Sequence, residues 1–147
     1  MNKLFFVICA VLFFGTACGL NPHNPEKARD AANAFLKELY IDSDLEQAIA
    51  MTDKEFLENY DKDYLGSLSR VARERFGGVE GFKPDFYVKD PGDMDIQLYY
   101  SSIAEKGIIY SRILLRKDEN GEYRISGITS SPLPHEEFRT ARQFKAK

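Results

Sequence analysis

The spacing of the apolar residues changes once along this chain, near Gly81. Before Gly81 they recur every three or four positions, which is the period of an amphipathic helix. After Gly81 they alternate with polar residues, which is the period of a half-buried strand. Helices followed by strands favour an α+β domain, in which N-terminal helices pack on an antiparallel sheet of about four strands.

Asn24 and Pro25 predict the start of the first helix. The Asn24 side chain can accept hydrogen bonds from the free amides of the first turn, where proline is tolerated. Asp42-Ser43-Asp44 ends this helix and caps a second, short one. The buried face of the first helix is formed by apolar residues at helical spacing, namely Ala28, Ala31, Ala32, Phe35, Leu36 and Leu39.

Two further helices are expected before Gly81. The four residues from Thr52 to Glu55 match a capping box and predict the start of a third helix. A fourth helix spans about 63–76 and ends at Gly77-Gly78.

The strands are predicted from alternation. Residues 85–88 form a short first strand. A second strand follows, in which alternate residues face the core, namely Met94, Ile96, Leu98 and Tyr100. A third strand spans 108–117.

A hairpin at 118–121 joins the third strand to the fourth, with Gly121 in the left-handed position of a bulged loop. In this register three pairs of residues are expected to lie opposite each other: Leu115 and Ile125, Ile113 and Gly127, and Arg116 and Arg124.

The N-terminus is typical of an export signal. Lys3 is followed by eleven consecutive apolar residues, 4–14, and then by the small residues 15–17. A membrane-spanning helix needs about 20 apolar residues, so residues 1–17 are predicted to be a secretory signal peptide that is removed.

Two products of cleavage are possible. Gly15 and Ala17 suit an ordinary signal peptidase, which would release a secreted protein that begins at Cys18. Because Cys9 lies in the removed segment, the mature chain would keep Cys18 alone, and a lone thiol cannot form an internal disulfide. A thioether to lipid accounts for this cysteine better than a free thiol does.

The stretch Gly15-Thr16-Ala17-Cys18 resembles the lipobox of bacterial lipoproteins, although leucine is commonest where Gly15 stands. The resemblance implies that Cys18 carries diacylglyceryl and acyl chains such as palmitate. The protein would then be anchored in the cell membrane or outer membrane and face the periplasm or the cell exterior. Gly19 fits outer-membrane sorting, and residues 18–24 would form a short tether.

Composition limits the partners. Removal of residues 1–17 from the 147 leaves 130, which suits one domain. The formal charge of the whole chain is −3, and the loss of Lys3 makes the mature charge −4. This mild acidity argues against nucleic acid as a partner.

Residues 25–131 resemble the nuclear transport factor 2-like superfamily, also called the cystatin-like cone. The resemblance rests on "AANAFLKELYIDSDLEQAIAMT", with Asp44 and Ala48 in a D-x-x-x-A pattern, and on "NGEYRISGI", where Tyr123 replaces the usual tryptophan. It implies helices packed on a curved antiparallel sheet and brings no functional residue with it.

Enzymes of that fold place an acid or base in the cone, so the candidates are Asp93, Asp95, Tyr99, Tyr100 and Tyr110. The two aspartates alternate with apolar residues and are therefore expected on the face opposite the core. The tyrosines are more often packing residues than ligand contacts, so no catalytic residue is assigned.

Metal and cofactor chemistry finds no support in the sequence. The two histidines, His23 and His135, lie outside the predicted core without the partners of a zinc site. The acidic clusters lack the glycine or glutamate of a calcium loop. No serine elbow or phosphate loop is present, so neither a cofactor nor a metal is expected.

Interaction residues are expected on the sheet face opposite the helices. Tyr110, Arg112, Arg116 and Arg124 combine residue types that are enriched at interfaces. They predict an envelope protein partner or a homodimer. The basic tail, 132–147, is expected to be a loosely docked terminal helix rather than a lipid-binding one.

Three hypotheses of function follow. The leading one is a lipid-anchored, non-catalytic domain that binds a small ligand or a protein. The alternatives are a small hydrolase or isomerase that uses a pocket aspartate with a tyrosine, and an envelope scaffold or inhibitor. An interior filled by Phe35, Leu98 and Leu115 would exclude both catalysis and ligand storage.

Overall fold

The computed structural model describes residues 22–61, 63–89, 92–136 and 140–144. The helical part comprises α1 (Pro25–Leu36), its π-helical continuation η1 (Lys37–Asp42), α2 (Leu45–Ala50), α3 (Lys54–Asn59) and α4 (Tyr64–Phe76). The strands are β1 (Val79–Val88), β2 (Asp95–Ala104), β3 (Gly107–Lys117) and β4 (Tyr123–Ser131). The predicted signal peptide and Cys18 lie outside the described residues.

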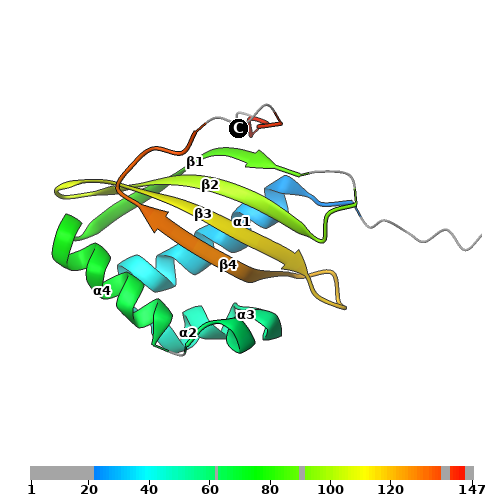
Figure 1. The fold of residues 1–147 in the computed structure, drawn as a ribbon, viewed down its shortest axis with the longest axis horizontal. Helices are drawn as coiled ribbons and strands as arrows, with labels where there is room; N and C mark the ends of the chain where they lie inside the picture. The colour runs from blue at the N-terminus through cyan, green and yellow to red at the C-terminus, as the bar shows by residue number, and fades with distance from the viewer. Residues whose placement is uncertain (1–21, 62, 90–91, 137–139, 145–147) are drawn as a thin grey trace, which may run out of the picture.

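The four strands form one antiparallel sheet in the order β1-β2-β3-β4, which is curved and open (Figure 1). α1 lies against one face of this sheet and contacts each of the four strands. α3 and α4 cover the same face near β4 and β3. The predicted α+β class, with helices first and a curved antiparallel sheet after them, is confirmed.

The first two helices begin where the sequence predicts. The Asn24 side chain accepts hydrogen bonds from the amides of Glu26 at 3.0 Å and Lys27 at 3.2 Å. The Asp44 side chain accepts one from the amide of Gln47 at 3.0 Å. Both caps need only residues close in sequence, so local chemistry decides them.

The third helix begins one residue later than predicted. Asp53, not Thr52, is the N-cap, and its carboxylate accepts a hydrogen bond from the amide of Phe56 at 2.7 Å. Thr52 instead pairs with Ile125 of β4 and donates its hydroxyl to the carbonyl of Ile49 at 2.7 Å. Pairing with the sheet therefore removes Thr52 from the helix.

Replacement of Asp53 by alanine is expected to lower the free energy of unfolding by about 1 kcal/mol, because the amide of Phe56 loses its partner. Asp53→Asn should retain the stability of the wild type, since asparagine caps equally well. Urea denaturation measures both variants. Equal losses in the two would contradict the cap.

The second strand is buried as predicted at Ile96, Leu98 and Tyr100, which are each 0% exposed. Met94 precedes β2 and is 69% exposed, so its predicted place in the core is wrong. β1 begins at Val79 rather than at 85. It tolerates Pro84 because β1 is an edge strand, where a missing amide leaves no neighbouring strand unpaired.

The hairpin register is confirmed for Leu115 opposite Ile125 and for Arg116 opposite Arg124. The third pair is wrong, because Ile113 lies opposite Ile128 and not opposite Gly127. The register shifts between Leu114 and Leu115, so that β4 carries one extra residue there. Gly121 has φ +79°, which is the left-handed conformation that the loop requires.

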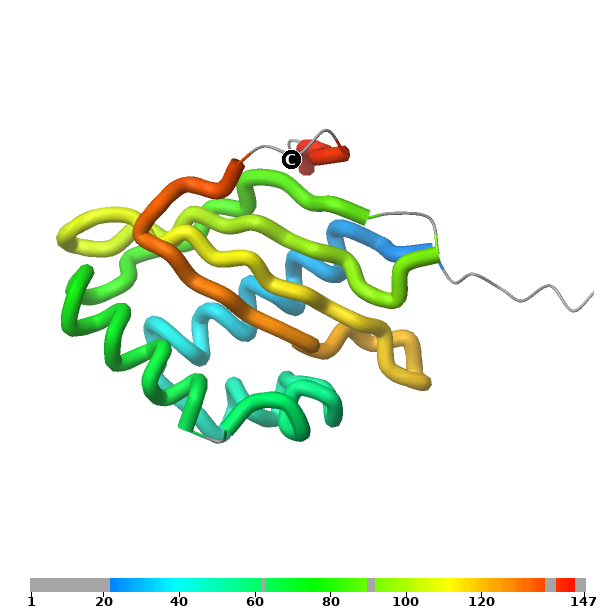
Figure 2. Tube along the Cα trace, viewed as in Figure 1, coloured from blue at the N-terminus to red at the C-terminus, as the bar shows by residue number. Residues whose placement is uncertain are grey.

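The described part of the tail contains no helix, so a helical tail is wrong for 132–136 and 140–144. Arg142 exchanges two backbone hydrogen bonds of 2.9 Å with Tyr87 of β1. Figure 2 shows this segment, in red, beside β1. The ring of Phe144 lies 5.1 Å from that of Tyr87. The tail thus covers part of an edge that would otherwise expose unpaired backbone groups.

Candidate functional site

The space between α1 and the sheet is filled by side chains. Phe35 from α1, Leu98 from β2 and Leu115 from β3 are each 0% exposed and belong to one apolar core. Tyr100 is also 0% exposed, and its hydroxyl donates a hydrogen bond to the carbonyl of Arg29 at 3.2 Å. Burial raises the pKa of Tyr100 far above its usual value, so the phenol stays protonated.

The interior also lacks an acid among the described residues. The buried polar side chains there are Arg29, Thr52, Ser69, Ser102 and Ser111. A catalytic carboxylate needs burial or a charged neighbour to shift its pKa. Of the two aspartates considered for this role, Asp93 is exposed and precedes β2, and Asp95 lies on the opposite face of the sheet, where it pairs with Arg116.

A small apolar cleft opens between α4 and the ends of β3 and β4. Its volume is about 90 Å³, and its walls include Leu68, Val71, Phe76 and Ile109. The volumes of pockets that hold a drug-sized ligand start at about 300 Å³. This cleft therefore accommodates no more than the end of one side chain.

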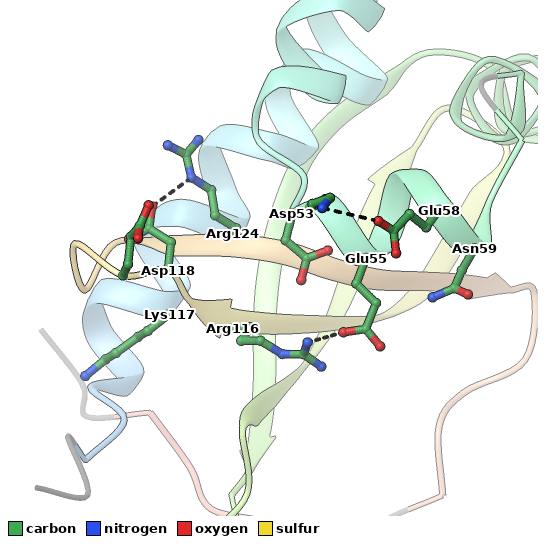
Figure 3. A pocket seen from close by; sticks show the side chains of 10 residues that line it. Asp53, Glu55, Glu58, Asn59, Arg116, Lys117, Asp118 and Arg124 are labelled. Carbon is green, nitrogen blue, oxygen red and sulfur yellow. Dashed lines mark hydrogen bonds and ion pairs between the residues drawn. The ribbon is translucent and has the colours of Figure 1, made fainter.

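A larger cleft lies between α3 and the β3–β4 hairpin (Figure 3). It has a volume of about 640 Å³ and is lined almost entirely by charged side chains. Both acidic and basic side chains line it. They are Asp53, Lys54, Glu55, Glu58, Arg116, Lys117, Asp118, Glu119 and Arg124.

Charged side chains in and beside this cleft form ion pairs with one another. Arg116 donates to both carboxylate oxygens of Asp95 at 3.0 Å and also pairs with Glu55. The hydrogen bonds to Asp95 raise the pKa of Arg116. Ser126 donates to Asp95 at 2.9 Å. Arg116 is therefore held in a network and does not extend freely as an interface residue.

Arg124 occupies the other wall of the cleft. It donates to Asp118 at 3.3 Å and to the carbonyl of Ala50 at 3.1 Å. The amide of Glu122, which binds the Asp118 carboxylate, lowers the pKa of Asp118. The residues that line this cleft include no histidine, cysteine or serine. The described lining therefore offers neither a serine or cysteine nucleophile nor an imidazole base to activate one.

Metal binding finds no support in the geometry either. Within the described ranges, no three histidine, cysteine, aspartate or glutamate side chains are grouped so as to hold an ion. His23 lies at the start of α1, and His135 packs on the opposite face of the sheet.

The outer sheet face, opposite the helices, is covered on the β1–β2 side. Tyr99 is only 2% exposed, because its ring stacks on Phe86 at 4.4 Å and contacts His135 edge-on at 4.9 Å. Ala141 completes this small apolar cluster. Burial lowers the pKa of His135 below its usual value, so the imidazole is predominantly neutral at pH 7.

Among the described residues, the outer face is less covered over β3 and β4, although the ring of Tyr110 meets that of His135 edge-on at 6.1 Å. Tyr110, Arg112 and Leu114 are partly exposed there, and Thr129 lies opposite Arg112. Leu114 lies flat across Gly127, where an added Cβ would stand only 2.7 Å from the Leu114 side chain. We call these four residues, Tyr110, Arg112, Leu114 and Thr129, the open sheet face.

The predicted ligand or interface residues thus separate into four groups. Tyr110 and Arg112 belong to the open sheet face, whereas Arg116 and Arg124 line the charged cleft. Tyr99 is covered by the tail, and Tyr100 faces the interior. The sequence contained the signal that separates the two neighbouring tyrosines, because alternation places them on opposite faces.

Comparison of the chain with protein-family models, curated proteins and solved structures gave no match. Among the described residues, no helix is long and apolar enough to cross a bilayer.

Proposed function

We propose that this protein is a bacterial lipoprotein, anchored through acylated Cys18, whose nuclear transport factor 2-like domain binds another envelope protein and does not catalyse a reaction. The filled interior carries the proposal. Because Phe35, Leu98 and Leu115 occupy the space between α1 and the sheet, neither a substrate nor a stored ligand fits there. A role at the surface is the function that this packing supports best.

The open sheet face is the surface that we propose for the partner. It combines an aliphatic side chain, Leu114, with the tyrosine and arginine that are enriched at interfaces. A two-fold dimer through this face would bring the Arg112 side chains of both copies to one interface. A partner of another kind, with an acidic patch, complements the face better than a second copy does.

The partner can be tested by isolation of the full-length lipidated protein in detergent, followed by native mass spectrometry. We expect a stoichiometric protein companion, and Arg112→Glu should weaken its binding by about tenfold or more, as at a central interface residue. Lys106→Glu makes the same charge change at the β2–β3 turn and should retain the companion. A bound small molecule with no protein companion would contradict the proposal.

The anchor has a test of its own. Cys18→Ser is expected to abolish acylation and to move the protein from the membrane fraction to the soluble fraction, because the sulfur that would carry the lipid is absent. Fatty-acid labelling and mass analysis of the mature N-terminus measure the change. Unchanged fractionation, or an unmodified Cys18 in the wild type, would disprove the anchor.

A further inference from the structure

Residues 22–24, which directly precede α1, are bound to the rest of the domain by hydrogen bonds. The backbone amide of Asn24 donates to the Tyr123 hydroxyl at 2.7 Å, and Nδ1 of His23 lies 3.2 Å from the same oxygen. Nε2 of His23 lies 3.1 Å from the carbonyl of Asp93. Tyr123 is itself only 9% exposed and belongs to the core, so its position is fixed.

Two lysines hold the backbone of the same segment. Lys117 donates to the carbonyl of Pro22 at 2.8 Å, and Lys89 donates to the carbonyl of His23 at 3.3 Å. Together with Tyr123 they form what we call the tether clamp. Its members come from the end of β3, the chain after β1 and the start of β4, which all lie at one end of the sheet (Figure 1).

The reach of the chain places this end near a lipid on Cys18. Four residue steps separate Cys18 from Pro22, and four extended residues span at most about 14 Å. β3 has 11 residues, which at about 3.3 Å each make the sheet roughly 35 Å long. The clamp end is therefore much closer to the anchor than the β2–β3 turn at the opposite end.

We propose that the tether clamp holds the domain end-on against the bilayer. The hairpin loop at 118–122 then faces the lipid headgroups, and the β2–β3 turn points away from them. The proposal rests on the lipid anchor of the proposed function and adds an orientation to it. The strands would then run roughly perpendicular to the membrane surface, and the open sheet face would not lie against the bilayer.

The bilayer-facing end is suited to headgroups rather than to the acyl region. Asp118, Glu119 and Glu122 lie within the hairpin loop, and these acids oppose insertion. Met94, 69% exposed beside the Asp93 contact, is an apolar exception at this end. The domain is thus expected to rest on a zwitterionic surface without penetrating it.

Energy transfer in phosphatidylcholine vesicles tests the orientation. A thioether at Cys18 leaves the mature protein without a free thiol, so one introduced cysteine can be labelled alone. Asn120→Cys marks the clamp end, and Lys106→Cys marks the opposite end. With an acceptor on the lipid headgroups, we expect severalfold greater transfer from position 120 than from position 106.

Release of the clamp provides the matched comparison. The combined change Lys89→Ala, Lys117→Ala and Tyr123→Phe removes the clamp's hydrogen bonds to residues 22–24 while it keeps the buried ring, and it should bring the two transfer efficiencies closer together. Lys83→Ala, an exposed lysine of β1, should leave the difference intact. Circular dichroism and thermal unfolding check that each variant is folded.

The outcomes separate the two proposals. Equal transfer from the two positions in the wild type on vesicles would overturn the orientation and leave the anchor standing. A wild type that fails to bind vesicles, with no acyl mass on Cys18, would overturn the anchor and the orientation together. An unchanged difference in the clamp-release variant would show that the clamp does not set the orientation.

Discussion

Replacement of Phe35 by alanine is expected to lower the free energy of unfolding by about 4 kcal/mol, within the range for loss of a large core aromatic. Phe35 lies in the middle of the apolar face of α1 and is 0% exposed. Alanine is a good helix former, so the loss arises from the cavity and the lost contacts with the sheet. Urea denaturation, with the slope compared between variants, measures it.

Leu57→Ala is the matched control for this change. Leu57 is also a large apolar residue of a helix, but it is 48% exposed on α3 and lies outside the core. Its replacement should cost less than about 1 kcal/mol. If Phe35→Ala cost as little, the interior would be loosely packed, and storage of a ligand there would become a reasonable hypothesis again.

The helical half could be predicted from the sequence because its determinants are local. Asn24 and Asp44 cap helices with amides two or three residues away, and the apolar face of α1 follows from spacing alone. The cap of α3 was misplaced because Thr52 pairs with Ile125, a residue 73 positions later. Choice between neighbouring caps thus depended on a contact that the local pattern does not contain.

The strands show the same division. Alternation correctly places Ile96, Leu98 and Tyr100 in the core. It does not predict the extra residue of β4, because neither Ser126 nor Gly127 has an apolar side chain that would mark the shift in register. The start of β1 at Val79 was not predicted, because Pro84 indicates the end of a strand unless that strand is known to lie at the edge of the sheet.

The candidate surface needed tertiary structure. Tyrosine and arginine could be assigned to the outer face from alternation, but the sequence does not show that the tail covers Tyr99 with His135. The pair of Arg116 with Asp95 had a weak signal, since both were expected on one face of neighbouring strands. The docking of His23 on Tyr123 joins residues 100 positions apart and had no signal at all.

Gly77→Ala is expected to lower the free energy of unfolding by about 3 kcal/mol, near the upper end for a residue forced into a glycine-only conformation. Gly77 ends α4 with φ +79° and ψ −158°, a backbone region that alanine essentially never adopts. An added Cβ would also stand 3.0 Å from the Cβ of Glu105 in the β2–β3 turn. Thermal and urea unfolding measure the loss.

Relief by backbone movement is limited at this position, which is why the loss should be large. The Gly77 amide donates to the carbonyl of Arg73 at 2.9 Å, and the carbonyls of Phe76 and Gly78 accept amides of the β2–β3 turn at 2.9 and 3.1 Å. Gly81→Ala is the control, because no atom lies within 4 Å of its added Cβ and its φ is not positive. It should change stability by less than about 1 kcal/mol. Similar effects of the two changes would show that the end of α4 can move freely relative to the β2–β3 turn.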